Sequence, residues 1–314
     1  MFPWIRITCA GVLLLAAPGC GRDAPPSSAH ASTPPAVAAP ARVLSIDPAA
    51  TEVVLALGAG DRLVGRTDFD TDPRLAHLPS LGRTLDPTPE AVAGLRPDLL
   101  IASGSPEHGS TAADAAARIG VRVHKMPIER VADVLASVRA VGRLLGLPAR
   151  GDSLADDLAA RLDGIRQRTA GRPRPSVLYV VWPDPLWTVG PGSFVDEIVS
   201  MAGGCNVFGD ALAPWPQVSL EEALRRDPDV VVVARGRESA EAFTLKLRAS
   251  AGWNQLTAVR QGRLYFVDSD LFHRPGPRMA VAADTLAKLL HPADTRAAAP
   301  STTGTPCPTR EASR

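Results

Sequence analysis

Residues 88–101 read TPEAVAGLRPDLLI, and residues 219–232, which lie 131 positions later, read SLEEALRRDPDVVV. In each copy a Thr or Ser is the expected N-cap of a helix, and a Glu follows near the positive end of that helix. A Pro-Asp pair then stops the helix, and an apolar run follows that is typical of strands in parallel sheets. A helix–strand unit that occurs twice without a gap predicts two similar α/β lobes.

The flanking sequence continues the alternation of strands and helices around each copy. Residues 43–46 predict a strand that leads into a helix capped by Asp47. In the second half, residues 177–181 and 264–267 predict strands, and Ser193 is the expected cap of a helix between them. This alternation predicts a mostly parallel sheet flanked by helices in each lobe.

Two helical stretches with one apolar face each lie between the copies. The second stretch, about residues 151–170, carries Leu154, Leu158, Leu162 and Ile165 on its apolar face and has no counterpart in the repeat. We interpret it as one long helix that bridges the lobes. Because a helix resists bending more than extended crossovers do, we expect the lobes to close only slightly on a ligand.

Composition and missing motifs exclude several function classes. The 34 Lys and Arg residues almost balance the 33 Asp and Glu residues, which argues against a nucleic-acid binder. The chain lacks a Walker loop, a G-x-G-x-x-G loop after a strand, H-E-x-x-H, C-x-x-C and G-x-S-x-G. Its six histidines are scattered, with no pair at metal-ligand spacing. We therefore expect a binding protein without a metal or cofactor rather than an enzyme.

The two ends of the chain read as export and tether segments. Residues 1–19 predict a lipoprotein-type signal peptide that ends at Ala17-Pro18-Gly19-Cys20, with Cys20 as the lipidated residue; plain secretion and an uncleaved anchor are the alternatives. Residues 20–41 predict a flexible Pro/Ala/Ser tether, and residues 292–314 predict a disordered tail. The remainder divides into an N-terminal lobe (42–148), a bridging helix (149–172) and a C-terminal lobe (173–291).

The four cysteines do not indicate a disulfide framework. Cys9 lies in the predicted signal peptide, and Cys20 is the predicted lipid site. A disulfide between Cys205 and Cys307 is possible outside the cytosol, but the sequence does not favour it.

Several motifs resemble one family of binding proteins. They are RVLS at residues 42–45, Thr51-Glu52, GAGDRLVG at residues 58–65 and LRPD at residues 95–98. They look like the helical-backbone class of substrate-binding proteins of ABC importers, which carry siderophores, haem and cobalamin. The resemblance covers about residues 42–291. It implies two Rossmann-like lobes joined by one long helix, with the ligand in the cleft between them, in agreement with the repeat.

Two further motifs are similar to those of the cobalamin binders within this class. They are PWPQVS at residues 214–219 and SDLFHR at residues 269–274, followed by Pro277-Arg278. The resemblance implies six ligand-binding residues: Phe69, Trp182, Trp187, Trp215, Asp270 and Arg274. Aromatic side chains suit a large, nearly flat corrin, and a few polar groups can fix its orientation. Trp253, in a helix–turn stretch, is expected to be structural.

The chain departs from the cobalamin binders at four positions. Thr84 stands where the best-known cobalamin binder has a tryptophan, and Ala202 and Ala287 stand where it has a disulfide pair. His273 replaces an acidic residue. We interpret His273 as a solvated loop histidine, with an approach to the cobalt of the ligand as the alternative.

Glu90 and Glu221 are the matched acids of the repeat. Residues at these positions of the family dock onto arginines of the membrane permease, and the alternative is compensation of the helix dipole. Because Glu222 is expected to complete a capping box with Ser219, Glu221 is expected to point outward.

The sequence and the resemblance therefore predict a lipid-anchored, extracytoplasmic binding protein that is a monomer. It would deliver cobalamin or a related corrinoid to a permease dimer and its ATPase subunits. A ferric siderophore or haem is the first alternative ligand, although the chain has only two tyrosines for a siderophore pocket. The second alternative is an exported corrinoid- or metal-processing enzyme that uses His108, His273 and Asp270.

Overall fold

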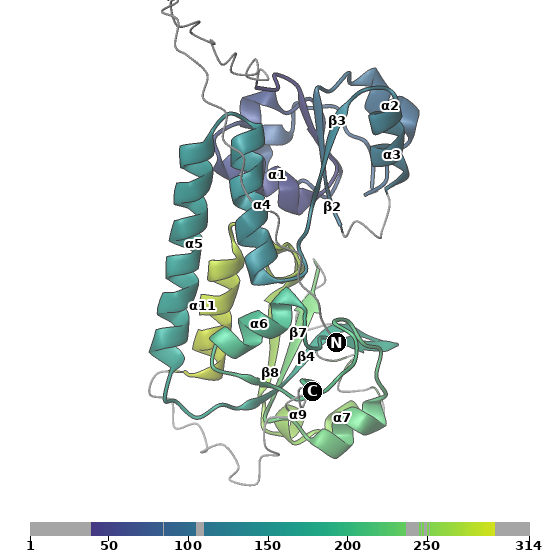
Figure 1. The fold of residues 1–314 in the computed structure, drawn as a ribbon. Helices are drawn as coiled ribbons and strands as arrows, with labels where there is room; N and C mark the ends of the chain where they lie inside the picture. The colour runs from purple at the N-terminus through teal and green to yellow at the C-terminus, as the bar shows by residue number, and fades with distance from the viewer. Residues whose placement is uncertain are drawn as a thin grey trace, which may run out of the picture. The chain divides into compact units, whose positions relative to one another are not determined.

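The computed structural model describes residues 39–83, 85–104, 110–236, 245, 247, 250 and 252–292. The predicted signal peptide, most of the tether and tail, Cys20, Thr84, His108 and Cys307 lie outside the described residues. Within them the predicted fold class is confirmed: the chain is α/β and has two lobes, each built on a mostly parallel sheet with helices on its faces (Figure 1).

The N-lobe is built on a three-stranded parallel sheet in the order β1-β2-β3. Its elements in chain order are β1 (Val43–Ser45), α1 (Pro48–Ala56), the 3-10 turns Gly60–Arg62 and Pro73–Leu75, α2 (Pro89–Gly94), β2 (Leu99–Ser103), α3 (Thr111–Arg118), β3 (Arg122–Met126) and α4 (Val131–Leu144). Buried residues of α1 and α4 cover one face of the sheet, and those of α2 and α3 cover the other.

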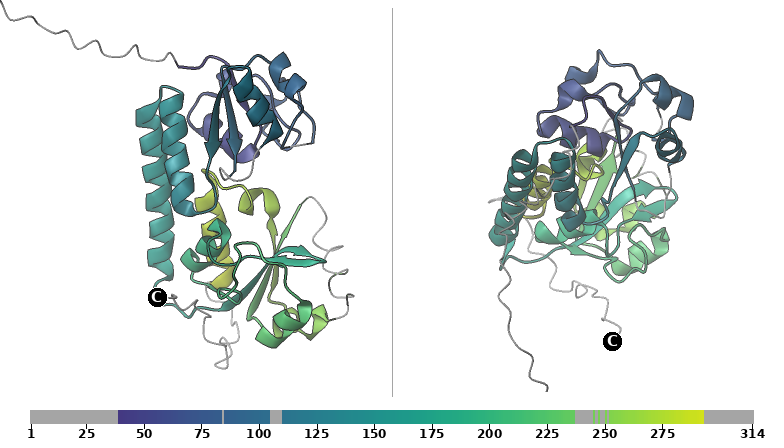
Figure 2. Two further views of the ribbon diagram at one scale, coloured as in Figure 1. Left: turned by 45° about the vertical axis from the view of Figure 1, so that its right-hand side comes forward. Right: turned by 45° about the horizontal axis from the view of Figure 1, so that its top comes forward.

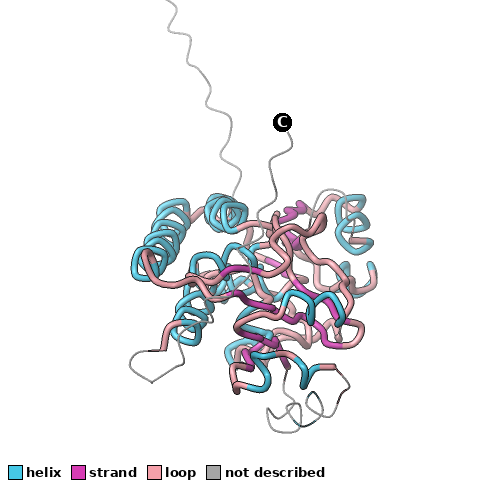
Figure 3. The backbone as a smooth tube through the Cα atoms, turned by 90° about the horizontal axis from the view of Figure 1, so that it is seen from below, coloured by secondary structure: helices cyan, strands magenta, loops and turns pink. Residues whose placement is uncertain are grey.

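After α5 (Pro148–Thr169), the C-lobe follows, with a five-stranded sheet in the order β5-β4-β7-β8 and with β6 beside β4. Its elements are β4 (Ser176–Pro183), β5 (Leu186–Thr188), α6 (Phe194–Met201), β6 (Cys205–Asn206), α7 (Leu220–Arg226), β7 (Val230–Arg235), the 3-10 turn Trp253–Gln255, α9 (Thr257–Arg260), β8 (Leu264–Asp268), α10 (Ser269–Phe272) and α11 (Met279–Leu290). Among the described strands of this sheet, β5 alone runs antiparallel to its neighbour. Figure 3 shows the strands in magenta among the cyan helices.

Side chains alternate across the C-lobe sheet and build a core on each of its faces. Val177, Tyr179 and Val232 pack with α5, α6 and α11, whereas Leu178 and Val231 pack with α7 and α9. This alternation follows from the period of two residues in a strand. Parallel strands buried on both faces explain why the sequence runs VVVV at residues 230–233 without polar interruption.

The predicted helix caps are confirmed where the repeat placed them. The side chains of Thr88 and Ser219 accept hydrogen bonds from Ala91 N and Glu222 N at the starts of α2 and α7. The predicted capping box at α7 is only half formed. The Glu222 carboxylate pairs with Arg226 Nε at 2.6 Å and with Arg225, because a strong ionic partner lies one turn along the helix.

Cys205 is disulfide-bonded, and the other three cysteines of the chain lie outside the described residues. The prediction concerned a disulfide between Cys205 and Cys307, and because Cys307 lies outside the described residues, it stays a prediction. Spacing alone is weak evidence for pairing, since only the fold decides which distant segments meet.

The long helix expected between the lobes is α5, and α4 packs along it (Figure 2). The two helices approach each other closely where Gly142 of α4 faces Gly151 of α5. A Cβ atom built on Gly142 would lie 2.7 Å from the Cα atom of Gly151, which is closer than such atoms come in proteins. The absence of side chains at these two glycines therefore allows the two helices to pack closely near the turn that joins them.

We expect Gly142→Ala to be destabilising although it improves helix propensity. The backbone of α5 must shift to accept the methyl group, and overpacking of this kind costs about 1–3 kcal/mol. Gly164→Ala is the matched control, because a Cβ at Gly164 of α5 would meet only the Arg168 side chain, at 3.8 Å. That variant should gain about 0.5–1 kcal/mol from propensity alone. Urea unfolding followed by circular dichroism measures both, and equal stability of the two variants would contradict the close contact.

Candidate functional site

The C-lobe contains a cavity of about 830 Å³ at the carboxyl ends of β4, β7 and β8. Val181 to Pro183, Ala234 to Gly236, and Ser269 with His273 line it from the three strand ends, and Trp253 forms part of its wall. Open α/β sheets bind ligands beyond the carboxyl ends of their strands, because loops and helix starts converge there. We call this space the C-lobe cavity, and it is the candidate site of the described residues.

Trp182 and Trp187 lie side by side at the edge of the C-lobe. Trp182 of β4 pairs directly with Trp187 of the antiparallel strand β5, and directly paired residues point to the same face of a sheet. Trp182 is 61% exposed and Trp187 is 37% exposed, although both are large apolar side chains. The Trp182 indole N–H donates to the carbonyl of Asp184 at 2.9 Å, which fixes one ring edge. An exposed indole pair of this kind offers a broad flat surface to a ligand.

The segment that carries Trp215 is fastened to the same strand β5. Thr188 N donates to Pro216 O at 3.0 Å, and Val218 N donates to Leu186 O at 2.9 Å. Trp215 is 37% exposed, and its ring meets the Phe194 ring edge-on with centroids 6.0 Å apart. The structure thus places Trp182 and Trp187 on paired strands and Trp215 in the loop bonded to β5, and we call these three residues the tryptophan cluster.

Phe69 lies on the N-lobe and is half-buried. The guanidinium of Arg83 lies over its ring at 5.5 Å from the centroid, and its backbone carbonyl accepts a hydrogen bond from Arg274 at 2.8 Å. The ring therefore meets an arginine of its own lobe, and the backbone that carries the ring is held from the C-lobe.

Asp270 and Arg274 form an ion pair with N···O 3.0 Å at α10. Arg274 also reaches Glu52 of the N-lobe at 3.4 Å, and its side chain is only 14% exposed. Protein groups hold the guanidinium, which leaves it little surface for a ligand, whereas the Asp270 side chain is half-exposed. Their contact with a ligand stays a prediction.

His273 is not the solvated loop histidine that the sequence suggests, and that interpretation is wrong. Its ring lines the C-lobe cavity, and its Nε2 lies 3.2 Å from the hydroxyl of the fully buried Tyr179. Burial lowers the pKa of His273 from 6.5 to about 4, against a smaller opposing effect of the Asp270 carboxylate. The imidazole is therefore neutral at pH 7. The sequence feature that could have predicted this contact is Tyr179, because a tyrosine in a buried apolar strand needs a polar partner for its hydroxyl.

Glu90 and Glu221 are both exposed in the first turn of their helices, α2 in the N-lobe and α7 in the C-lobe. Both helices lie on the side of the molecule away from α5 (Figures 1 and 2). Their role in docking stays a prediction.

The described residues contain neither a group of metal-binding side chains nor a helix suited to a bilayer. No three His, Cys, Asp or Glu side chains there gather as metal ligands would. Of the helices in that part of the chain, none is both long enough and apolar enough to cross a bilayer.

Comparison with known proteins places the chain among transport binding proteins. The family model described as "Periplasmic binding protein" matches residues 43–271. An ABC transporter substrate-binding lipoprotein of Bacillus subtilis, itself described as uncharacterized, is 29% identical over 261 residues, which cover 81% of each chain.

Two relatives with stated ligands are also similar. A vitamin B12-binding protein of Vibrio cholerae is 28% identical over 79% of this chain and 88% of its own. The crystal structure of the vitamin B12-binding protein of that species matches 80% of this chain and 96% of its own, with 25% identity and a TM-score of 0.69. A periplasmic haem-binding protein of Pseudomonas aeruginosa matches 82% of this chain and 94% of its own, with 28% identity and a TM-score of 0.72.

Proposed function

Because the chain belongs to the periplasmic binding protein family, we propose that it is the substrate-binding lipoprotein of an ABC importer and that it captures cobalamin or a related corrinoid. The ligand lies against the tryptophan cluster beside the C-lobe cavity, with Phe69 contributing from the N-lobe. The protein then delivers it to the permease dimer, whose ATPase subunits are separate chains. It performs no chemistry itself and works as a monomer.

The tryptophan cluster carries this proposal. Three large indoles remain partly exposed on β4, β5 and the loop bonded to β5, although burying the rest of their apolar surface would stabilise the fold. A flat macrocycle with a polar fringe suits such a surface, since the rings give broad contact at little cost in rotamer freedom. The relatives that bind vitamin B12 support the same ligand class.

Haem or a ferric siderophore is the alternative ligand. A relative named for haem binding is as similar as those named for vitamin B12. Against a siderophore, one of the two tyrosines, Tyr179, is fully buried and has its hydroxyl next to His273. An enzyme that uses His273 and Asp270 is the remaining alternative, and it would show turnover in place of stoichiometric binding.

The protein acts outside the cytoplasm, and we propose an anchor at Cys20. The export pattern of residues 1–20 supports this location, and a relative described as a lipoprotein supports the anchor.

Isothermal titration of the purified chain tests the ligand, with cyanocobalamin, haem and a ferric siderophore compared under one set of conditions. We expect one-to-one binding of cyanocobalamin with a Kd below about 1 μM. Trp215→Ala should weaken it at least about tenfold, or 1.4 kcal/mol. Leu212→Ala is the control, because this exposed side chain lies in the same loop. Tight binding of haem or the siderophore without cyanocobalamin binding would keep the importer class and overturn the ligand.

A further inference from the structure

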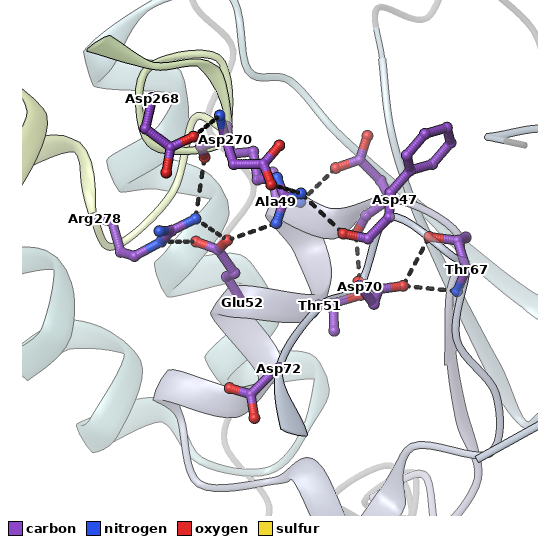
Figure 4. A network of polar contacts seen from close by, with 12 residues as sticks. Asp47, Ala49, Thr51, Glu52, Thr67, Asp70, Asp72, Asp268, Asp270 and Arg278 are labelled. Atoms are coloured by element: carbon purple, nitrogen blue, oxygen red, sulfur yellow. Dashed lines mark hydrogen bonds and ion pairs between the residues drawn. The ribbon is translucent and has the colours of Figure 1, made fainter. Parts of the chain in front are cut away.

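Glu52 of the N-lobe holds two arginines of the C-lobe. Arg278, at the start of α11, donates to the Glu52 carboxylate through Nε at 2.9 Å and through a terminal nitrogen at 2.6 Å (Figure 4). Arg274 approaches the same carboxylate at 3.4 Å. A fork of two hydrogen bonds to one carboxylate is the strong, directional form of the arginine–carboxylate pair. These contacts join residues more than 220 positions apart in the chain.

Arg274 extends this cluster to Phe69. Its second terminal nitrogen donates to the Phe69 carbonyl at 2.8 Å and lies 3.0 Å from the Asp270 carboxylate. The side chains of Glu52 and Arg274 are 17% and 14% exposed, so water screens this pair less than it screens a surface ion pair. The Arg274 guanidinium therefore contacts helix α1, the Phe69 backbone and the first turn of α10.

Ion pairs of Glu52 with Arg274 and Arg278 join α1 to the loop before α11. A hollow of about 440 Å³ lies beside the cluster, lined by Glu52, Arg274 and Arg278 among other residues. A strong, directional ionic contact between the two lobes has the physical properties of a latch.

We propose that Glu52, Arg274 and Arg278 form an interlobe latch that sets the spacing of the two lobes and, through the Phe69 carbonyl, the position of the Phe69 ring. The first part concerns the protein without ligand. The second part rests on the proposed function, because it makes Arg274 a positioning residue for a ring that contacts the corrin.

The interlobe spacing can be measured without any ligand. Spin labels on p-acetylphenylalanine, placed in the full chain at the exposed positions Ala117 of α3 and Gln261 after α9, report the distance between the lobes by double electron–electron resonance. Glu52→Gln keeps the shape of the side chain and removes its charge. We expect Glu52→Gln and Arg278→Met each to broaden the distance distribution and move it to longer values. Their effects should not add, because both break one interaction.

Asp284→Asn is the matched control, since it removes a carboxylate from ion pairs with Arg168 and Lys288 that do not join the lobes. Thermal unfolding of each variant verifies that it is folded, and the conservative Arg278→Lys variant should restore part of the closed distribution. Distances in Glu52→Gln and Arg278→Met that match those of the wild type would overturn the latch.

Cyanocobalamin dissociation tests the second part. Stopped-flow displacement should show about tenfold faster release from Arg274→Met than from the wild type, equivalent to 1.4 kcal/mol. Unchanged release would overturn the positioning role of Arg274. If the wild type binds no cyanocobalamin but the distances shift as expected, the proposed ligand fails and the latch stands.

Discussion

Replacing Glu90 and Glu221 together by lysine is expected to reduce ligand uptake through the importer at least about tenfold while the Kd for the ligand stays unchanged. The two carboxylates occupy equivalent positions of the repeat, one on each lobe, and both are exposed. Under the docking proposal they meet arginines of the permease. Lysines would place like charges there, which costs several kcal/mol and blocks the correct register. Neither residue belongs to the tryptophan cluster.

Uptake of radiolabelled cobalamin by cells that express this chain with its own importer is the measurement. The control is Asp157→Lys combined with Asp163→Lys, which changes the net charge equally on exposed positions of α5. Each lost glutamate also removes a favourable helix-dipole interaction of about 0.3–1 kcal/mol, so unfolding must be measured in parallel. Normal uptake by the glutamate variant, or an equal loss in the control, would contradict docking through these two residues.

Acidification is expected to destabilise the protein through His273. The unfolded histidine binds a proton below its ordinary pKa of 6.5, whereas the folded one stays neutral until about pH 4. This contribution to stability is therefore complete above pH 6.5 and is lost as the pH falls toward 4. The full loss is about 3 kcal/mol, and about 2 kcal/mol of it occurs by pH 5.

Urea unfolding at pH 7 and pH 5 checks this expectation in the wild type and in His273→Gln, which cannot titrate and can still meet the Tyr179 hydroxyl. Burial also lowers the pKa values of His124 and His291, so both proteins lose stability on acidification. The wild type should lose about 2 kcal/mol more than the variant. Equal losses in the two proteins would show that His273 titrates normally.

Features that depend on a few neighbouring residues could be predicted from the sequence. Thr88 and Ser219 were identifiable as caps because capping is decided within one turn of a helix. The bridging helix α5 was predicted to within a few residues, since its apolar face repeats over many turns. Trp215 was singled out by the resemblance of its motif to that of the cobalamin binders; its side chain is partly exposed, and its contact with a ligand stays a prediction.

Features that depend on register between distant segments could not be predicted. Glu52 lies in an ordinary helix pattern, and nothing local links it to Arg278, which pairs with it from the other lobe. The position of His273 beside Tyr179 of β4 follows from how α10 packs against β7 and β8, and sequence spacing does not report that. The disulfide at Cys205 could not be predicted for the same reason.

Helix α4 belongs to both hydrophobic cores, and this has a consequence for how the protein unfolds. Its first turns place Val131 and Val134 in the core of the C-lobe, and its later turns place Val138 and Val141 in the core of the N-lobe. Helix α5 does the same in reverse, with Ala155 in one core and Leu162 in the other. Melting either lobe therefore removes part of the other lobe's core. The two lobes are expected to unfold as one cooperative unit, in a single thermal transition, although each resembles a domain in its own right.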